Sequence, residues 1–232
     1  MLKFVAAILI LQLLSAREKF LSSAKLPNST GRPEVFVKPV NQRLFIPCFS
    51  SVCFKNLGCF QPFIIAAYIS APPLTVCPQD PEEMGVRFVV LSRGNYDKFE
   101  SLSAIQPNSK VAFMIHGILS EYDTFIYLLP SYFLLTDYDH VVFVDWSIAA
   151  DPYAVSQIPS PGLTFFVTHA NVEVVGRMVC NVIHDVHRHR NVAMKDILLA
   201  GFSAGGNMIA FAAAYCDKRY ELQVGRCTGK SA

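Results

Sequence analysis

The sequence has 232 residues, of which 52% are hydrophobic and 16% are charged, and its formal net charge is +2. This hydrophobic content excludes a disordered chain, and the length is typical of a single domain with a sizeable core. So small a net charge, with no basic stripe along the sequence, argues against nucleic acid as a partner.

The first residues are typical of a secretory signal peptide, which we expect over residues 1–24. Lys3 precedes the apolar run Phe4–Leu14, which is too short to span a bilayer. Cleavage is expected after Ala16 or after Ala24, and the second position fits the small-residue rule better. No other uninterrupted apolar run is long enough to cross a membrane, so the sequence predicts a secreted, extracellular protein without a transmembrane segment.

Residues 25–52 are expected to form an extended leader. The part from Lys25 to Pro47 holds four prolines and shows no helical or strand periodicity. Asn28 opens the tripeptide Asn-Ser-Thr, which is an acceptor for glycosylation on an exposed segment. Glycosylation at Asn28 would agree with secretion.

The chain contains seven cysteines, which suits disulfide bonding in an oxidising compartment. Because seven is odd, at least one thiol stays free or pairs outside the chain. Cys180 lies in an apolar helical pattern and is the candidate for a buried free thiol. The spacing alone leaves the connectivity open. The candidate pairs are Cys53 with Cys59, Cys48 with Cys77, and Cys216 with Cys227.

Hydrophobic patterning predicts an α/β fold with a mostly parallel central sheet and flanking helices. The segment from Phe63 to Val76 is broken by two prolines and is expected to be irregular. The expected strands are Val86–Leu91, Lys110–Ile115, His140–Trp146, Ile197–Ala200 and Leu222–Cys227. The expected helices are Phe125–Leu135, Phe165–His189 and one that follows the Gly-rich turn after Ala200.

That turn carries Gly201-x-Ser203-x-Gly205 between an apolar strand and an alanine-rich helix. This pattern predicts a nucleophile elbow, in which a serine on a strained turn is exposed above the sheet. The glycines leave room where a Cβ would clash. The backbone amide of Ala204 would then be one donor to an oxyanion, helped by the positive end of the helix.

A second motif, His116-Gly117-Ile118, follows the predicted strand Lys110–Ile115 and so lies at the carboxyl edge of the sheet. Ligand sites of open α/β sheets lie on this edge. We expect the backbone amide of Ile118 to be the second oxyanion donor beside Ser203, because loops of this type supply it in α/β-hydrolases.

Other polar residues have more ordinary explanations. Asp145 ends a strand at the same edge, but the acid of an α/β-hydrolase triad follows the serine in the chain, so we favour an anchoring carboxylate. His184, His187 and His189 could hold a metal, yet cationic or polar side chains are common at a helix C-terminus. We therefore expect no metal and no cofactor.

Taken together, these motifs resemble the pancreatic lipase family of secreted α/β-hydrolases, from about Cys53 to the last residue. Gly201–Gly206 stands where that family commonly has Gly-His-Ser-Leu-Gly-Ala. The other matching segments, in the family's order, are Val52–Phe60, Arg87-Phe88, Ile115–Ile118, Val144–Ser147 and Asn171–Gly176. The resemblance implies a carboxylic ester hydrolase that acts on triglyceride or phospholipid at a lipid interface, with Ser203 as the nucleophile.

The sequence departs from that family near its end. Arg226–Ala232 resembles the family's stretch Arg-Ile-Thr-Gly-Leu-Asp-Pro-Ala, and the triad aspartate would fall on Ser231. No histidine follows Ser203. Residues 53–232 are therefore expected to form an incomplete α/β-hydrolase domain, truncated after the strand that follows the elbow helix. Without the base, turnover in a serine hydrolase falls by about 10⁶.

Three hypotheses follow for the chain. It is a fragment or short product of a lipase or phospholipase A1, inactive by itself; it is a non-catalytic lipid-binding or yolk-type relative; or a rearranged loop or another chain supplies the base. We favour the first, because a long-standing non-catalytic protein need not keep Ser203. The oligomeric state is left open by the sequence.

Overall fold

The computed structural model describes residues 48–65, 74–118, 137–150 and 161–230. Its centre is a six-stranded sheet in the order β10-β9-β7-β8-β5-β6. The strands are β5 (Arg87–Ser92), β6 (Asn95–Glu100), β7 (Val111–Ile115), β8 (His140–Asp145), β9 (Ile197–Phe202) and β10 (Arg226–Lys230). β7, β8, β9 and β10 run parallel, whereas β5 and β6 add an antiparallel hairpin. The sheet is therefore mixed: the four parallel strands extend from the edge strand β10 to β8, and the antiparallel hairpin forms the other edge.

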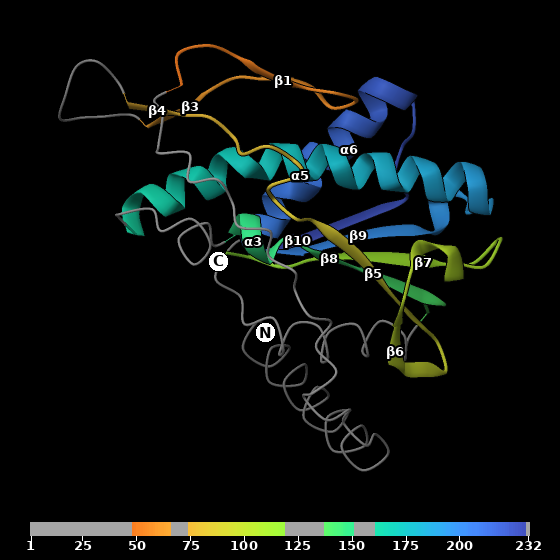
Figure 1. Ribbon diagram of the computed structural model, residues 1–232. Coiled ribbons are helices and arrows are strands. Elements are labelled where there is room, and N and C mark those ends of the chain that lie inside the picture. The colour runs from red at the N-terminus through yellow and green to blue at the C-terminus, as the bar shows by residue number, and fades with distance from the viewer. Residues whose placement is uncertain (1–47, 66–73, 119–136, 151–160, 231–232) are drawn as a thin grey trace, which may run out of the picture.

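The long helix α5 (Pro161–Arg190) and helix α6 (Ala204–Tyr220) lie together on one side of the sheet (Figure 1). β7 and β8 are buried along their whole length. Alternate residues of each strand belong to two separate apolar clusters: Phe113 packs in the cluster under the helices, and Met114 packs in the cluster on the opposite face. This burial on both faces explains why these strands are nearly continuous apolar runs in the sequence.

Short elements complete the fold. Two antiparallel hairpins lie on the outer side of α5 (Figure 1). They are formed by β1 (Val52–Phe54) with β2 (Gly58–Phe60) and by β3 (Phe63–Ile65) with β4 (Leu74–Val76). The remaining elements are α3 (Ser147–Ala150) and the 3₁₀ turns η2 (Leu102–Ala104) and η3 (Met194–Asp196). Among the described residues, no helix combines the length and apolarity needed to cross a bilayer.

The expected strands agree with the structure except for the last one. Leu222–Cys227 was expected, but β10 begins only at Arg226. Glu221 ends α6 in the left-handed conformation, and Gly225 then passes so close to Lys195 that a Cβ would lie 2.6 Å from its Cα. The residues before Arg226 therefore close the helix instead of extending the strand.

The expectation of irregular structure over residues 63–76 was also wrong at both ends of that segment. Phe63 pairs with Val76 and Ile64 with Thr75, and Phe63 packs against Phe166 of α5 at a ring distance of 6.4 Å. Strands of three residues carry too little alternation to be recognised in a sequence. The signal peptide, Asn28, most of the leader and the expected helix Phe125–Leu135 lie outside the described residues.

Three disulfides are present: Cys48–Cys77, Cys53–Cys59 and Cys180–Cys216. The first two pairings agree with the sequence analysis, but the pairing of Cys216 with Cys227 was wrong. Cys180 on α5 and Cys216 on α6 are fully buried between the two helices, with a Cα–Cα distance of 5.5 Å. Cys227 lies exposed on β10 and is the free cysteine of the described chain. Close helix packing, not loop length, therefore decides which thiol joins Cys216.

Breaking this helix–helix disulfide should destabilise the domain more than removing the free thiol. We expect Cys180→Ala with Cys216→Ala to lower the free energy of unfolding by about 3 to 4 kcal/mol, because a loop of this length is released in the unfolded chain. Cys227→Ala should change it by less than about 0.5 kcal/mol. Denaturant unfolding measures both, and an equal loss in the two proteins would contradict the observed pairing.

Candidate active site

Ser203 occupies a strained turn between β9 and α6. Its backbone angles are φ 54° and ψ −122°, and α6 begins at the next residue, Ala204. Residues other than glycine rarely adopt such a positive φ, and holding a serine in this backbone conformation costs about 1 to 3 kcal/mol. The strand–turn–helix arrangement that the Gly-x-Ser-x-Gly pattern predicted is therefore present, and Ser203 carries the positive φ of this turn.

The two glycines of the pattern are required by close backbone contacts. A Cβ on Gly201 would meet the carbonyl oxygen of Gly205, and a Cβ on Gly205 would meet the carbonyl oxygen of Ile115. In both cases the approach is closer than real Cβ atoms tolerate. α6 is thus set directly against the end of β7, which brings the serine turn beside the loop that follows β7.

That loop contains the second predicted motif. A Cβ on Gly117 would lie 2.9 Å from the Cβ of Ser203 and 3.2 Å from the carbonyl oxygen of Phe202. Ile118 is partly buried against the main apolar cluster, and Ala204 is buried at the start of α6. The structure therefore brings the Ser203 turn, the Gly117–Ile118 segment and the first residue of α6 together at one edge of the sheet.

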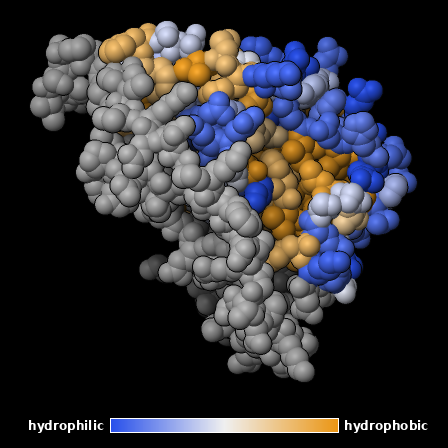
Figure 2. Space-filling model, viewed as in Figure 1, coloured by the Kyte–Doolittle hydropathy of each residue, from blue (hydrophilic) through white to orange (hydrophobic). Residues whose placement is uncertain are grey.

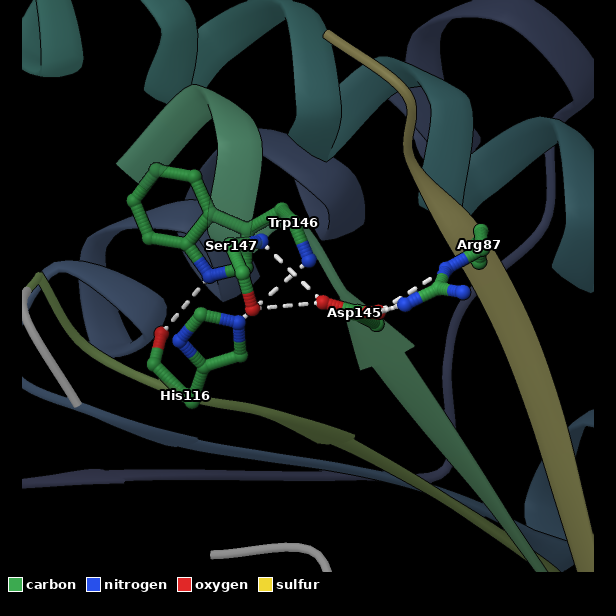
Figure 3. Close-up of polar contacts among 5 residues, drawn as sticks. All are labelled: Arg87, His116, Asp145, Trp146 and Ser147. Atoms are coloured by element: carbon green, nitrogen blue, oxygen red, sulfur yellow. Dashed lines mark hydrogen bonds and ion pairs between the residues drawn. The ribbon is translucent and has the colours of Figure 1, made fainter. Parts of the chain in front are cut away.

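His116 holds this loop in place (Figure 3). Its Nε2 accepts the backbone N–H of Trp146 at 3.3 Å, so Nδ1 carries the proton and donates to the carbonyl oxygen of Gly117 at 2.8 Å. The indole N–H of Trp146 donates to the His116 carbonyl at 2.9 Å. Because the carbonyl of Gly117 and the N–H of Ile118 belong to one planar peptide and point in opposite directions, fixing the first orients the second.

Asp145 anchors the start of α3, as we had favoured from the sequence. One carboxylate oxygen accepts the backbone N–H of Ser147 at 3.1 Å and its hydroxyl at 2.6 Å. The other oxygen forms an ion pair with Arg87 of the neighbouring strand (Figure 3). The carboxylate is buried and fully engaged in these contacts, so it supports the edge of the sheet beside His116.

The histidines of the chain are all within the described residues, and none of the hydrogen bonds found there joins one to Ser203. His184 stacks on Tyr220 with ring centroids 4.0 Å apart, and His187 Nδ1 contacts the carbonyl of Val192 at 2.8 Å. His189 also lies in the last turn of α5. Across the part of the chain that the structure describes, no group of histidine, cysteine and acidic side chains is arranged to hold a metal ion.

The sequence analysis missed Trp146 and Arg87 as supports of the site. Trp146 is fully buried, and its ring lies 5.4 Å from that of His116. It is the single tryptophan of the sequence and comes directly after Asp145 at the end of a predicted strand. The position of this tryptophan at the carboxyl edge could have predicted its role, because a buried indole N–H needs a hydrogen-bond acceptor nearby.

The buried His116 makes stability depend on pH. Burial lowers its pKa from the usual 6.5, against the opposing effects of the Gly117 carbonyl and of Asp145. The folded protein therefore keeps His116 neutral where the unfolded chain protonates it. Its contribution is fully present above about pH 6.5 and is lost as the pH falls towards the folded pKa, at up to about 1.4 kcal/mol per pH unit.

A titration of the His116 ring protons by NMR tests this directly, and we expect a folded-state pKa below 6.5. His116→Asn keeps a donor for the Gly117 carbonyl but cannot titrate, so unfolding should become less pH-dependent below about pH 6.5. His140 is a matched control, since burial also lowers its pKa and the His116 variant leaves its contribution intact. Protonation of His116 at or above pH 6.5 in the folded protein would contradict the assignment.

A serine elbow at the carboxyl edge of a mainly parallel sheet, facing the loop after a neighbouring strand, defines the α/β-hydrolase fold, and the chain has this fold. A solved fungal esterase from Rhizomucor miehei is 18% identical, with a TM-score of 0.33, over 60% of this chain and 41% of its own. So low a score adds nothing to the assignment, which stands on the strand order and the elbow. No family model matches the chain.

Three proteins are similar to this chain in sequence. Inactive pancreatic lipase-related protein 1 of Mus musculus is 25% identical over 68% of this chain and 33% of its own length. Pancreatic triacylglycerol lipase of Equus caballus is 25% identical over 78% and 38%. Pancreatic lipase-related protein 2 of Rattus norvegicus is 22% identical over 77% and 37%. The chain is thus similar in sequence to pancreatic lipases and lipase-related proteins, and it spans about a third of the length of these relatives.

Proposed function

We propose that this chain carries the nucleophile half of a lipase-like carboxylic ester hydrolase that acts on the acyl esters of triglyceride or phospholipid. Ser203 is the nucleophile, and the backbone amides of Ile118 and Ala204 stabilise the oxyanion. The observation that carries the proposal is the strained Ser203 turn with Gly117 set against it. Strain of this kind costs stability and is typical of functional sites.

No contact among the described residues gives Ser203 a base, so the reaction would need a base supplied by another part of the protein or by another chain. A serine hydroxyl is a weak nucleophile until a base removes its proton. His116, the histidine nearest in sequence to the oxyanion loop, uses both ring nitrogens to hold that loop. We therefore expect this chain by itself to turn over long-chain esters no faster than its Ser203→Ala variant.

The proposal places the protein outside the cell. Three disulfides join six of the seven cysteines, which suits an oxidising compartment. The apolar run near the N-terminus has the composition of a signal peptide. In this proposal residues 1–24 are removed, Asn28 becomes a glycosylation site, and the α/β-hydrolase unit follows the leader from about Cys53.

A second candidate is a non-catalytic lipid-binding or yolk-type protein. The absence of a histidine hydrogen-bonded to Ser203 among the described residues favours it, and one of the relatives is named an inactive lipase-related protein. The two candidates differ in the state of the oxyanion amides. A formed oxyanion site accelerates attack by Ser203 once its hydroxyl is deprotonated, whereas a purely structural turn does not.

Labelling by a fluorophosphonate over a range of pH separates the two. We expect Ser203 to react slowly at neutral pH and about tenfold faster per pH unit up to about pH 9, because hydroxide replaces the missing base. The same serine in the denatured chain, located by peptide mapping, is the matched control and should react at least tenfold more slowly.

Equal labelling of folded and denatured chains would favour the non-catalytic candidate. Ser203→Ala should remove the label altogether, which assigns the signal to this residue. Rapid labelling at neutral pH, or ester turnover that depends on Ser203, would contradict the expectation that Ser203 lacks a base. Either result would show that another group acts as the base.

A further inference from the structure

The aromatic ring of Phe202 stands directly before Ser203 in the chain, at the end of β9. Residues 197–200 of the same strand are buried, but Phe202 is exposed by 40%. This chain has phenylalanine where the pancreatic lipase family, which it resembles, commonly has histidine. An exposed apolar ring beside the serine is therefore a feature of this chain that the proposed chemistry does not yet use.

The ring lies on the face of the sheet opposite α6. Leu198 and Ala200 pack in the apolar cluster on that face. Side chains alternate between the two faces along a strand, so Phe202 points to that same face. Gly201 faces the other way, because a Cβ on it would meet the carbonyl oxygen of Gly205 in α6. The Phe202 ring therefore lies beyond the last buried layer of that cluster, at the carboxyl edge that carries the site.

The ring is set against the loop that carries a predicted oxyanion amide. A Cβ placed on Gly117 would lie 3.5 Å from Cδ1 of Phe202 and 2.9 Å from the Cβ of Ser203. The ring edge and the serine side chain therefore approach Gly117 together, and no side chain on that residue separates them. Ile118, the next residue, would donate its amide to the oxyanion. An ester carbonyl held there would have the Phe202 ring beside the chain attached to its carbon.

The neighbours of the ring differ in charge on its two sides. On the β7 side, one step past the last register pair, stands His116. This histidine is neutral, because its Nε2 accepts a backbone N–H, and its ring stacks on Phe143 at 5.7 Å. On the β10 side, the register partner of Phe202 is Lys230. Removing a charge from water is costly, whereas an apolar chain gains from contact with a ring. An apolar group that leaves the serine is thus favoured on the β7 side of Phe202.

We propose that Phe202 is a specificity-determining residue, whose ring contacts the hydrocarbon chain of the ester's acyl group and favours long chains over short ones. The inference rests on the proposed function of Ser203 and adds the residue that selects the acyl chain. Burial of one methylene group strengthens binding by up to about fourfold. A ring covers only one side of a chain, so several methylene groups lying on it should together give about tenfold.

Labelling of Ser203 by two phosphonofluoridates tests the proposal. Both carry an ethoxy group, and the group bonded to phosphorus through carbon is methyl in one and octyl in the other. The serine oxygen bonds to phosphorus, fluoride leaves, and hydroxide takes the proton at about pH 9, so the alkyl group occupies the place of an acyl chain. Dividing the octyl-to-methyl rate ratio by that of the denatured chain removes the difference in intrinsic reactivity. We expect a corrected ratio of about ten or more in the unaltered chain.

Substitution of the ring should abolish this preference. Phe202→Ala should lower the corrected ratio to about two, and Phe202→Leu, which keeps an apolar side chain, should retain most of it. Phe211→Ala is the matched control, because Phe211 is also exposed, by 42%, but lies on α6. The octyl probe could also bind the apolar residues that Figure 2 shows over β5, below α5, but binding there would not accelerate the reaction at Ser203.

A second measurement detects the contact without the reaction. Octyl acetate added to the Ser203→Ala chain should shift the NMR signals of the Phe202 ring, whereas ethyl acetate at the same concentration should not. These signals are assigned from their loss in Phe202→Leu. Such a shift, with no labelling of the folded chain by either probe, would mean that the proposed chemistry fails and the contact stands. Absence of the shift, an unchanged ratio in Phe202→Ala, an equal loss in Phe211→Ala, or a preference for octyl only in place of the ethoxy group would each overturn the proposal.

Discussion

At the carboxyl edge of the sheet, the backbone of α6 approaches the end of β7 more closely than any side chain on Gly205 would permit. This contact sets the direction in which the chain leaves β9 and forces Ser203 into its positive φ. The serine turn also leaves no room for a side chain on Gly117, where a Cβ would lie 2.9 Å from the Cβ of Ser203. The geometry of the candidate site is therefore set mainly by backbone packing, and the surrounding side chains stabilise that geometry.

The polar network around His116 depends on this arrangement. β7 and β8 are adjacent and parallel, with Ile115 opposite Val144, so the residues that follow them, His116 and Trp146, meet just beyond the sheet. Their hydrogen bonds use every donor and acceptor that a neutral imidazole and an indole offer. Both ring nitrogens of His116 are therefore engaged in holding the Gly117–Ile118 segment, and neither is left to accept a proton from Ser203.

Sequence patterns were sufficient where a segment's structure follows from its own residues. The buried strands and the Gly-x-Ser-x-Gly turn are of this kind. A continuous apolar run indicates a strand buried on both faces, and the glycines indicate a turn where a Cβ would clash. The partner of Cys216 and the hairpin of β3 with β4 could not be predicted. The first depends on how closely two helices pack at Gly176, where a Cβ would lie 2.9 Å from Phe211, and the second on pairing between short, distant segments.

The central claim is that packing holds Ser203 in a conformation that its side chain opposes. The free energy of unfolding of Ser203→Gly, compared with that of Ser203→Ala, measures this directly. Glycine relieves the strain at φ 54°, so the account predicts that Ser203→Gly is more stable than Ser203→Ala by about 1 kcal/mol, after the entropy of the unfolded glycine is allowed for. A glycine variant that is less stable than the alanine variant would show that the turn is not strained and would contradict the account.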